Sequence, residues 1–184
     1  MRRLRWIVPL LLVVVALSAA AAYLFVQPDL ADGRDRVDDA WSPLRAPLAA
    51  RYEALGVLTQ ALVDAGAADR AVAKDLTATL QRWSRFALRG PEHTDPGAET
   101  AIANDLEALG RRTRANIAAS ARLNTNPGVV GALGAFDLAV IPPPLVNAYN
   151  RAVRTYQDAR DGTVASLLAK VLAFDARPVL QIGA

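Results

Sequence analysis

The chain has 184 residues, no cysteine and nearly balanced charge, which together exclude disulfides, thiolate chemistry and a broad nucleic-acid-binding surface. Three of its 21 basic residues lie within the first 26 positions, which hold no acid, so the rest of the chain carries 18 basic and 18 acidic residues. With abundant alanine and few β-branched runs beyond those first positions, the composition favours helix.

The most apolar stretch runs from Trp6 to Val26 without a charged residue. At about 1.5 Å per residue, a helix of this length spans roughly 30 Å, the thickness of the hydrocarbon core of a bilayer. The stretch is therefore predicted to be a single transmembrane helix in the lipid bilayer, with a proline tolerated in its first turn and aromatic rings near both ends. The residues that mark this span are Trp6, Pro9, Tyr23 and Val26.

The charges that flank this span predict its orientation. Arg2, Arg3 and Arg5 precede it, whereas Asp29 and Asp32 follow it. Because basic residues favour the cytoplasmic side, the N-terminus is expected in the cytoplasm and the remaining domain outside. The alternative is a secretory signal cleaved among the small residues 18–22, although the apolar run continues past that point.

These patterns divide the chain into five parts. The expected fold is all-α: an antiparallel bundle of about four long helices, preceded by a single N-terminal transmembrane helix. The parts are a cationic N-terminus at residues 1–5, the anchor at 6–26, a linker at 27–33 that begins with a turn, the helical bundle at 34–174 and a tail at 175–184.

The first helix of the bundle is predicted from an apolar stripe whose members recur every three or four residues. Pro43 and Pro47 interrupt it, because each lacks an amide donor and crowds the preceding turn. A bend or a fresh helix start is expected there, with Ser42 as its N-cap, and residues 64–69, which include Gly66, form either a turn or a loosened point in the helix. The stripe consists of Val37, Trp41, Leu44, Leu48, Tyr52, Leu55, Leu58 and Leu62.

Two further stripes predict two more helices, from Val72 to Phe86 and from Ile102 to Ser120. A loop over residues 89–97 separates them, and Asp95 is expected to be the N-cap of the second. This loop holds His93, the only histidine, which has too few neighbouring ligands for a metal site. No metal or cofactor is therefore expected.

The C-terminal half is divided by turn residues. Residues 124–128 end the third helix, and the glycine-rich residues 128–134 form either a short, tightly packed helix or a flexible segment. The three prolines at 142–144 must break any helix, after which a stripe resumes over residues 146–160. A final short helix over residues 164–174 either caps the bundle or rests on the membrane.

Five stretches of the chain resemble, in order, the motifs of LemA family proteins. Residues 36–41 and 48–53 are similar to the family's R-V-E-x-A-W and L-x-x-R-Y-D patterns. Residues 124–126, 149–156 and 174–178 are similar to its N-x-N, Y-N-x-A-V-R-x-Y and F-x-x-R-P patterns. The matched residues, to which we assign a structural role, are Val37, Trp41, Arg51, Tyr52, Asn124, Asn126, Tyr149, Asn150, Val153, Tyr156, Phe174, Arg177 and Pro178.

The resemblance implies a single-pass protein of a bacterial cell membrane whose domain is an antiparallel bundle of long helices. It implies no established catalytic residue, and it suggests a role in assemblies with other membrane proteins. The chain departs from the family at Gly56 and Val57, where Pro-Asn is usual, and at residues 142–144, where the family has a continuous charged helix. Family members are sometimes described with the opposite topology, which the charges flanking the apolar run do not support.

The function expected from these features is a membrane-anchored, non-catalytic scaffold or adaptor for another envelope or membrane protein. The alternative is a lipid- or peptide-binding helical domain with a groove lined by Trp83, Tyr149 and Tyr156. An enzyme is a remote third alternative, because no catalytic signature is present and a Ser/His/Asp arrangement would need His93.

Overall fold

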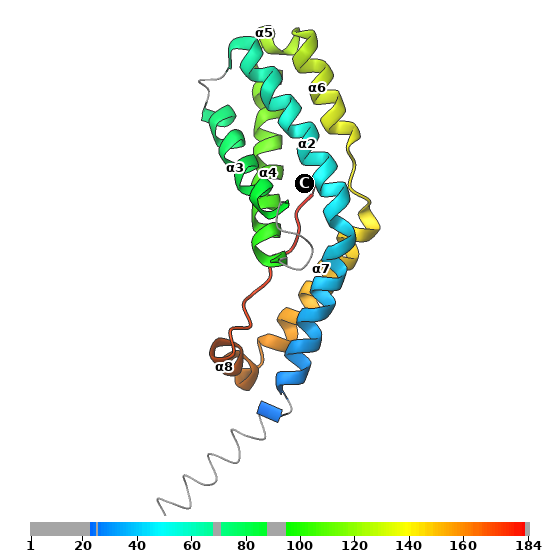
Figure 1. Ribbon diagram of the computed structural model, residues 1–184, viewed down its shortest axis with the longest axis vertical. Coiled ribbons are helices and arrows are strands. Elements are labelled where there is room, and N and C mark those ends of the chain that lie inside the picture. Colours follow the sequence, from blue (N-terminus) through cyan, green and yellow to red (C-terminus); the bar gives the residue numbers. More distant parts are fainter. Residues whose placement is uncertain (1–22, 25, 68–70, 88–94, 183–184) are drawn as a thin grey trace, which may run out of the picture.

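The computed structural model describes residues 23–24, 26–67, 71–87 and 95–182, and these residues form helices and no strand (Figure 1). The prediction of an all-helical fold is confirmed within them. Trp6 and Pro9 of the anchor, the candidate cleavage site and His93 lie outside the described residues. Among the described helices, none is by itself long and apolar enough to cross a membrane, and Pro127–Leu138 with Pro143–Arg160 passes that test only as a pair bent by 60°.

The long helices of the bundle are α2, α3, α4 and α7, with 18, 17, 23 and 18 residues. A φ of 71° at Gly66, in the turn after α2, is the left-handed conformation that suits glycine and confirms the turn, one of the two alternatives predicted there. After a helix over residues 26–41, the elements in chain order are η1 (Ser42–Leu44), α2 (Arg45–Leu62), η2 (Val63–Ala67), α3 (Ala71–Ala87), α4 (Pro96–Ala118), α5 (Ala121–Asn124), α6 (Pro127–Leu138), α7 (Pro143–Arg160) and α8 (Thr163–Val171).

The helices form two tiers along the longest axis of the molecule (Figure 1). In one tier, α2 packs against α6 on one side and against α3 and α4 on the other. In the other tier, α7 lies beside η1 and the helix of residues 26–41, and α8 follows at the far end. The helix of residues 26–41 continues through η1 into α2, and this succession joins the two tiers (Figure 1).

The linker predicted at residues 27–33, and the turn at its start, are wrong, because residues 26–41 are helical. This helix buries Leu30 completely and brings Gly33 so close to Tyr156 that an added Cβ would lie 3.1 Å from Cδ2 of the ring. Val26, predicted to end the anchor, packs partly against the core. The packed bundle therefore begins at about the end of the apolar run, and not at residue 34.

Pro43 and Pro47 act as helix interruptions. Residues 42–44 form a 3-10 turn and α2 begins at Arg45, which confirms the predicted bend or fresh start. Pro47 lies in the first turn of α2, where the missing amide removes little hydrogen bonding. No side chain caps η1 or α2, so the prediction of Ser42 as an N-cap is wrong.

The later helix starts follow local sequence closely. Asp95 accepts a hydrogen bond from the amide of Ala98, which confirms it as the N-cap of α4. The glycine-rich segment is helical as α6, with Asn126 as its N-cap. The proline run does separate two helices, since α6 ends at Leu138 and α7 begins at Pro143. Pro143 and Pro144 are themselves the first two residues of α7, where a helix needs no amide donor.

The predicted stripes pack into one hydrophobic core. The rings of Trp41 and Tyr149 lie 5.0 Å apart between centroids, and those of Tyr52 and Trp83 meet edge to face at 4.8 Å. The largest side chains that are fully buried are Trp41, Tyr149, Tyr156, Phe136, Leu30, Leu44, Leu48, Leu55, Leu58, Leu76, Leu106 and Ile117.

Candidate functional site

The segment after α8 is not a free tail. Residues 174–182, which we call the C-terminal strap, have no regular secondary structure and run back along α4 and α7 (Figure 1). The absence of helix from residue 175 was predicted, but the tight packing was not: Arg177 and Leu180 of the strap are buried. The strap therefore belongs to the folded domain.

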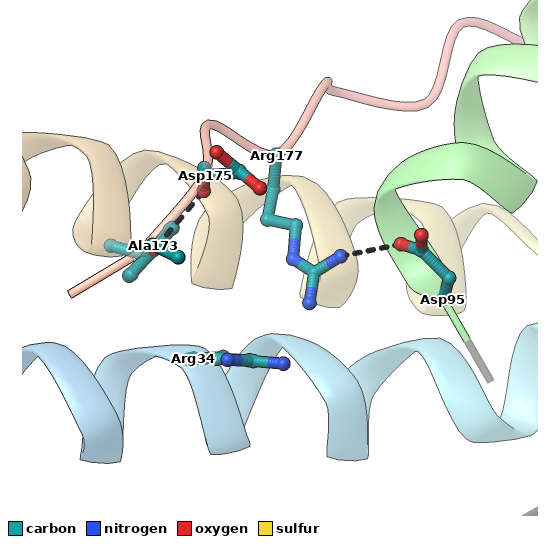
Figure 2. A pocket seen from close by; sticks show the side chains of 6 residues that line it. Arg34, Asp95, Ala173, Asp175 and Arg177 are labelled. Atoms are coloured by element: carbon teal, nitrogen blue, oxygen red, sulfur yellow. Dashed lines mark hydrogen bonds and ion pairs between the residues drawn. The ribbon is translucent and has the colours of Figure 1, made fainter. Parts of the chain in front are cut away.

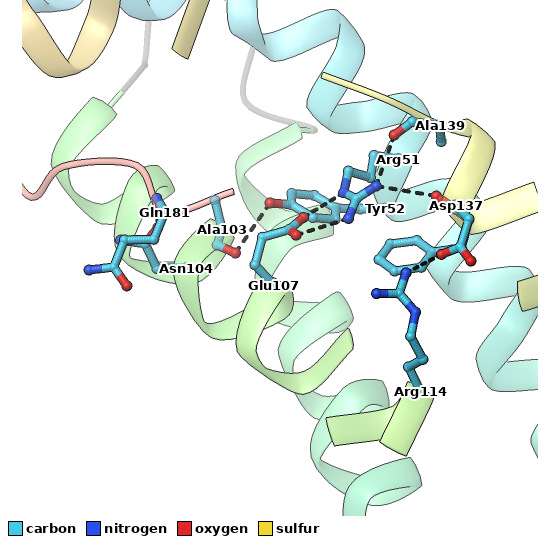
Figure 3. Close-up of polar contacts among 10 residues, drawn as sticks. Arg51, Tyr52, Ala103, Asn104, Glu107, Arg114, Asp137, Ala139 and Gln181 are labelled. Atoms are coloured by element: carbon cyan, nitrogen blue, oxygen red, sulfur yellow. Dashed lines mark hydrogen bonds and ion pairs between the residues drawn. The ribbon is translucent and has the colours of Figure 1, made fainter. Parts of the chain in front are cut away.

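Two asparagine side chains hold the strap by its backbone. Asn150 on α7 donates from Nδ2 to the carbonyl of Leu180 at 2.9 Å and accepts from the Leu180 amide at 2.7 Å. Asn104 on α4 donates to the carbonyl of Val179 at 2.8 Å and accepts from the amide of Gln181 at 2.8 Å. Figure 3 shows Asn104 beside Gln181. Each carboxamide thus pairs with the strap as the N–H and C=O of one residue in a neighbouring strand would.

Further side chains of α7 bind the carbonyls earlier in the strap. Arg160 donates to Phe174 at 3.2 Å, and Gln157 donates to Arg177 at 2.8 Å. The hydroxyls of Tyr156 and Tyr149 donate to the carbonyls of Asp175 and Pro178 at 3.0 and 3.1 Å. The set of side chains that hold the strap, which we call the α4–α7 groove, is Asn104, Tyr149, Asn150, Tyr156, Gln157 and Arg160.

The two tyrosines stay protonated at neutral pH. Burial raises the pKa of Tyr149 to about 12, although its hydrogen bond with Thr100 acts in the opposite direction. Burial likewise raises the pKa of Tyr156 above its ordinary value. Because Tyr149 donates its proton to the strap, Thr100 must be the donor in their 2.7 Å contact.

One strap side chain is held by carboxylates from two other elements. Arg177 contacts Asp95, the N-cap of α4, at 2.8 Å and Asp38, on the helix of residues 26–41, at 3.4 Å. Burial raises the pKa of Asp38 above its usual value, and the guanidinium of Arg177 opposes that rise. Arg177 therefore joins the N-terminal helix, α4 and the strap.

A polar cavity of about 230 Å³ opens where the strap begins, lined by Arg34, Asp95, Tyr156, Ala173, Asp175 and Arg177 (Figure 2). Figure 2 shows Arg177 reaching toward Asp95 across this cavity, with Arg34 on the helix opposite. Two arginines and two aspartates leave the lining without a net charge. Ala173, at the turn from α8 into the strap, has a φ of 55°, a strained value for a residue that is not glycine.

A second polar cluster lies inside the bundle (Figure 3). Arg51 of α2 binds both carboxylate oxygens of Glu107 on α4, at 2.6 and 2.9 Å. Its remaining donors reach the carbonyls of Phe136 and Ala139, and its guanidinium lies 4.1 Å from the centre of the Phe136 ring. Because these contacts join α2 to α4 and to the C-terminal end of α6, the cluster holds the three helices together.

Glu99 of α4 forms a similar link near η1. It accepts a 2.7 Å hydrogen bond from the indole of Trp41, and Arg45 lies 3.4 Å from the same oxygen. The other carboxylate oxygen of Glu99 is buried without a partner among the described residues.

The residues of the LemA-like motifs have several different roles in the structure. Arg51 and Tyr52 tie α2 to α4, since the Tyr52 hydroxyl donates to the carbonyl of Ala103. Val37, Trp41 and Val153 are buried core residues, Asn126 is an N-cap, and Asn124 is exposed at the end of α5. The remaining ones meet at the strap, as groove or as strap residues: Tyr149, Asn150, Tyr156, Phe174, Arg177 and Pro178.

Sequence reasoning missed several polar residues of these sites. Glu107 and Asn104 stand among the apolar positions of α4 with nothing local to mark them. Glu99 could have been found from the sequence, because it lies three residues before Ile102 and so continues the apolar stripe of α4 toward the N-terminus. A carboxylate on an apolar stripe needs a buried partner. No sequence pattern marks Gln157.

The three residues predicted to line one groove do not lie together. Tyr149 and Tyr156 are fully buried and donate hydrogen bonds to the strap, whereas Trp83 packs against Tyr52. No group of three or more potential metal ligands occurs among the described residues.

Comparison with known proteins identifies no family for this chain. No family model, no curated protein and no solved structure matches it. The resemblance to LemA family proteins therefore enters the functional argument as a proposal.

Proposed function

We propose that the chain is a membrane-tethered, non-catalytic helical adaptor of the LemA type, which holds another envelope or membrane protein at the bacterial cell membrane. The observation that carries the tether is the uncharged run of Trp6 to Val26, preceded by three arginines. The flanking charges favour a cytoplasmic N-terminus and an external bundle. The resemblance to LemA motifs along the chain supports the same role.

Exposed apolar side chains at one end of the bundle are consistent with such a tether. Leu24 is exposed where the apolar run enters the bundle, and Leu167 and Val171 of α8 are 65% and 79% exposed. Residues 23–24 and α8 lie at the same end of the longest axis (Figure 1). Apolar groups that are costly in water are favourable next to lipid.

The adaptor role is supported by further exposed apolar side chains, on α6 and just after it. Leu138, the last residue of α6, is 84% exposed, and Val130 on α6 and Val140 after its end are also exposed. Gly131 and Gly134 lie on the same helix with no neighbouring atom within 4 Å of an added Cβ, so another surface has space to approach. The exposed ion pair of Asp137 with Arg114 lies next to Leu138, and exposed apolar side chains bordered by charged ones are typical of a protein contact.

Fractionation of cells that express the full chain tests the tether. We expect the protein to stay in the membrane after washing with high salt and alkaline carbonate, and to be released by detergent, because an uncharged span is held by burial in lipid. A chain that lacks residues 1–25 is the matched control. Release of the full chain by salt alone would refute the tether.

The cysteine-free sequence allows a clean test of orientation. Ser84→Cys introduces one thiol at an exposed position of α3, and Arg3→Cys introduces one before the span. With a membrane-impermeant maleimide on intact spheroplasts, we expect labelling of Ser84→Cys only. Labelling of Arg3→Cys only would reverse the proposed topology.

Photo-crosslinking in native membranes tests the adaptor role. A photoreactive residue in place of Leu138 should give a crosslinked product with a membrane or envelope protein, whereas the same residue in place of Asp158, exposed on α7, should give far less. If neither position gave a crosslinked product although the protein was found in the membrane, binding of a partner through α6 would be contradicted.

A further inference from the structure

The α4–α7 groove recognises the backbone of the strap more than its side chains. Six carbonyls between residues 174 and 180 accept hydrogen bonds from groove side chains, and the amides of Leu180 and Gln181 donate to two of the same side chains. Any extended polypeptide presents these groups at the same spacing. The groove is therefore built to hold an extended chain whatever its sequence.

The direction of these bonds matches the geometry of an extended strand. The amide and carbonyl of Leu180 both point to Asn150 on α7, whereas the carbonyl of Val179 and the amide of Gln181 point to Asn104 on α4. In a strand, the N–H and C=O of one residue point to one side and those of the next residue point to the other, and here each side meets one carboxamide. Two side chains thus replace the two neighbouring strands that a sheet would supply.

Two positions of the strap add selectivity. Arg177 lies between Asp38 and Asp95, so a basic residue suits this position. Leu180, three residues later, is buried in the core, so this position needs an apolar side chain. At Pro178 the groove uses only the carbonyl, so proline costs no hydrogen bond there.

The strap leaves α8 at a closed helix end. Ala173 has a positive φ there, the amide of Phe174 donates to the carbonyl of Ala169 at 2.8 Å, and the polar cavity lies beside this turn. Release of the strap would leave the helices of the bundle in register, because the strap supplies no part of any helix.

We propose that the α4–α7 groove is a binding site for an extended segment of a partner protein, with a basic residue three positions before an apolar one, and that the chain's own strap occupies it until the partner displaces it. This names a binding surface for the adaptor role proposed above and rests on that role, but not on the membrane tether. In the resting protein the strap competes for the site, so the partner must supply a better match or a high local concentration.

Peptide binding to the full chain in detergent micelles tests the groove directly. Arg177→Ala with Leu180→Ala weakens the internal strap and leaves the groove side chains intact. A fluorescent peptide with the sequence of residues 173–182 should bind this double variant saturably, and at least about tenfold more tightly than it binds the unaltered protein, where the strap competes. The same peptide with both alanine changes is the control and should not bind.

A variant of the groove distinguishes hydrogen bonding to the peptide backbone from nonspecific binding of the peptide. Adding Asn150→Ala to the double variant removes two hydrogen bonds to the peptide and should weaken binding by about tenfold or more. Absence of binding to a double variant that retains its helical circular dichroism would overturn the proposal, as would equal binding of the control peptide. If peptide binding fails while crosslinking through α6 succeeds, the adaptor role stands and the groove proposal falls.

Hydrogen exchange on the unaltered protein tests whether the strap leaves the groove, and this test holds even if a variant fails to fold. The amides of Leu180 and Gln181 should exchange at least about tenfold faster than the slowest amides of α2, because the strap opens without unfolding of the bundle. Excess peptide with the sequence of residues 173–182 should accelerate this exchange further. Exchange of the strap amides at the rate of global unfolding would show a permanent structural element and overturn the proposal.

Discussion

Replacing Glu107 by Ala tests the buried ion pair most directly. The change leaves the guanidinium of Arg51, whose side chain is 11% exposed, without its carboxylate, which is 2% exposed. Removal of one partner from a buried pair typically costs about 3–5 kcal/mol. Since Arg51 keeps two carbonyl partners and the Phe136 ring, we expect the lower end, about 3 kcal/mol in the free energy of unfolding.

The measurement is thermal unfolding of the full chain in detergent micelles, followed by far-ultraviolet circular dichroism. For a protein of this size, about 3 kcal/mol corresponds to a fall in Tm of roughly 6–12 °C. The matched control is Asp137→Ala, which removes the pair between Arg114 and Asp137, whose side chains are 49% and 45% exposed. That change should cost less than about 1 kcal/mol.

A double variant distinguishes the loss of a favourable pair from the cost of an unpaired charge. Arg51→Met with Glu107→Leu removes both charges and should be clearly more stable than Glu107→Ala alone, because no buried charge is left unpaired, although the carbonyls of Phe136 and Ala139 lose a donor. A loss below about 1 kcal/mol for Glu107→Ala would mean that water reaches Arg51, and the reasoning from burial would be refuted.

Three smaller predictions follow from single positions. Gly134→Ala should raise the free energy of unfolding in urea by about 0.5–1 kcal/mol, since its added Cβ meets nothing within 4 Å. Gly110→Ala should show no such gain, since its Cβ would lie 3.0 Å from Cζ of Phe136, and equal gains at both sites would contradict the packing. Asn126→Ala should cost about 1 kcal/mol in the same assay through loss of the α6 cap, and an unchanged midpoint would exclude the cap. Burial raises the pKa of Tyr149 to about 12, so the protonated Tyr149 stabilises the fold fully below about pH 10, and this stabilisation is lost as the pH rises through 12. Tyr149→Phe should therefore reduce the fall in Tm at alkaline pH. An identical fall in the variant would show that the pKa of Tyr149 is not raised in the folded protein.

Local sequence was a good guide to where helices lie and how they start. The intervals of three and four residues predict α2, α3, α4 and α7, and Asp95 followed by Pro96 predicts the N-cap of α4. These signals succeed because helix periodicity and capping depend on residues within a few positions of one another. The linker at residues 27–33 failed for the complementary reason: Leu30 and Gly33 pack on α7 and the core, and that packing keeps a sequence with Pro28 helical.

The sequence by itself determined an all-helical chain with a balanced charge on its main domain and an uncharged run near its start, because composition and short-range spacing are sufficient for these properties. Only the tertiary structure decided that Arg51 meets Glu107 and that Asn104 and Asn150 hold the strap, since each of these contacts joins residues more than 25 positions apart. A polar side chain in a helix has the same local pattern whether it faces water or a buried partner. The fold alone brings the partner within hydrogen-bonding distance, and thereby turns a predicted tail into the occupant of a groove.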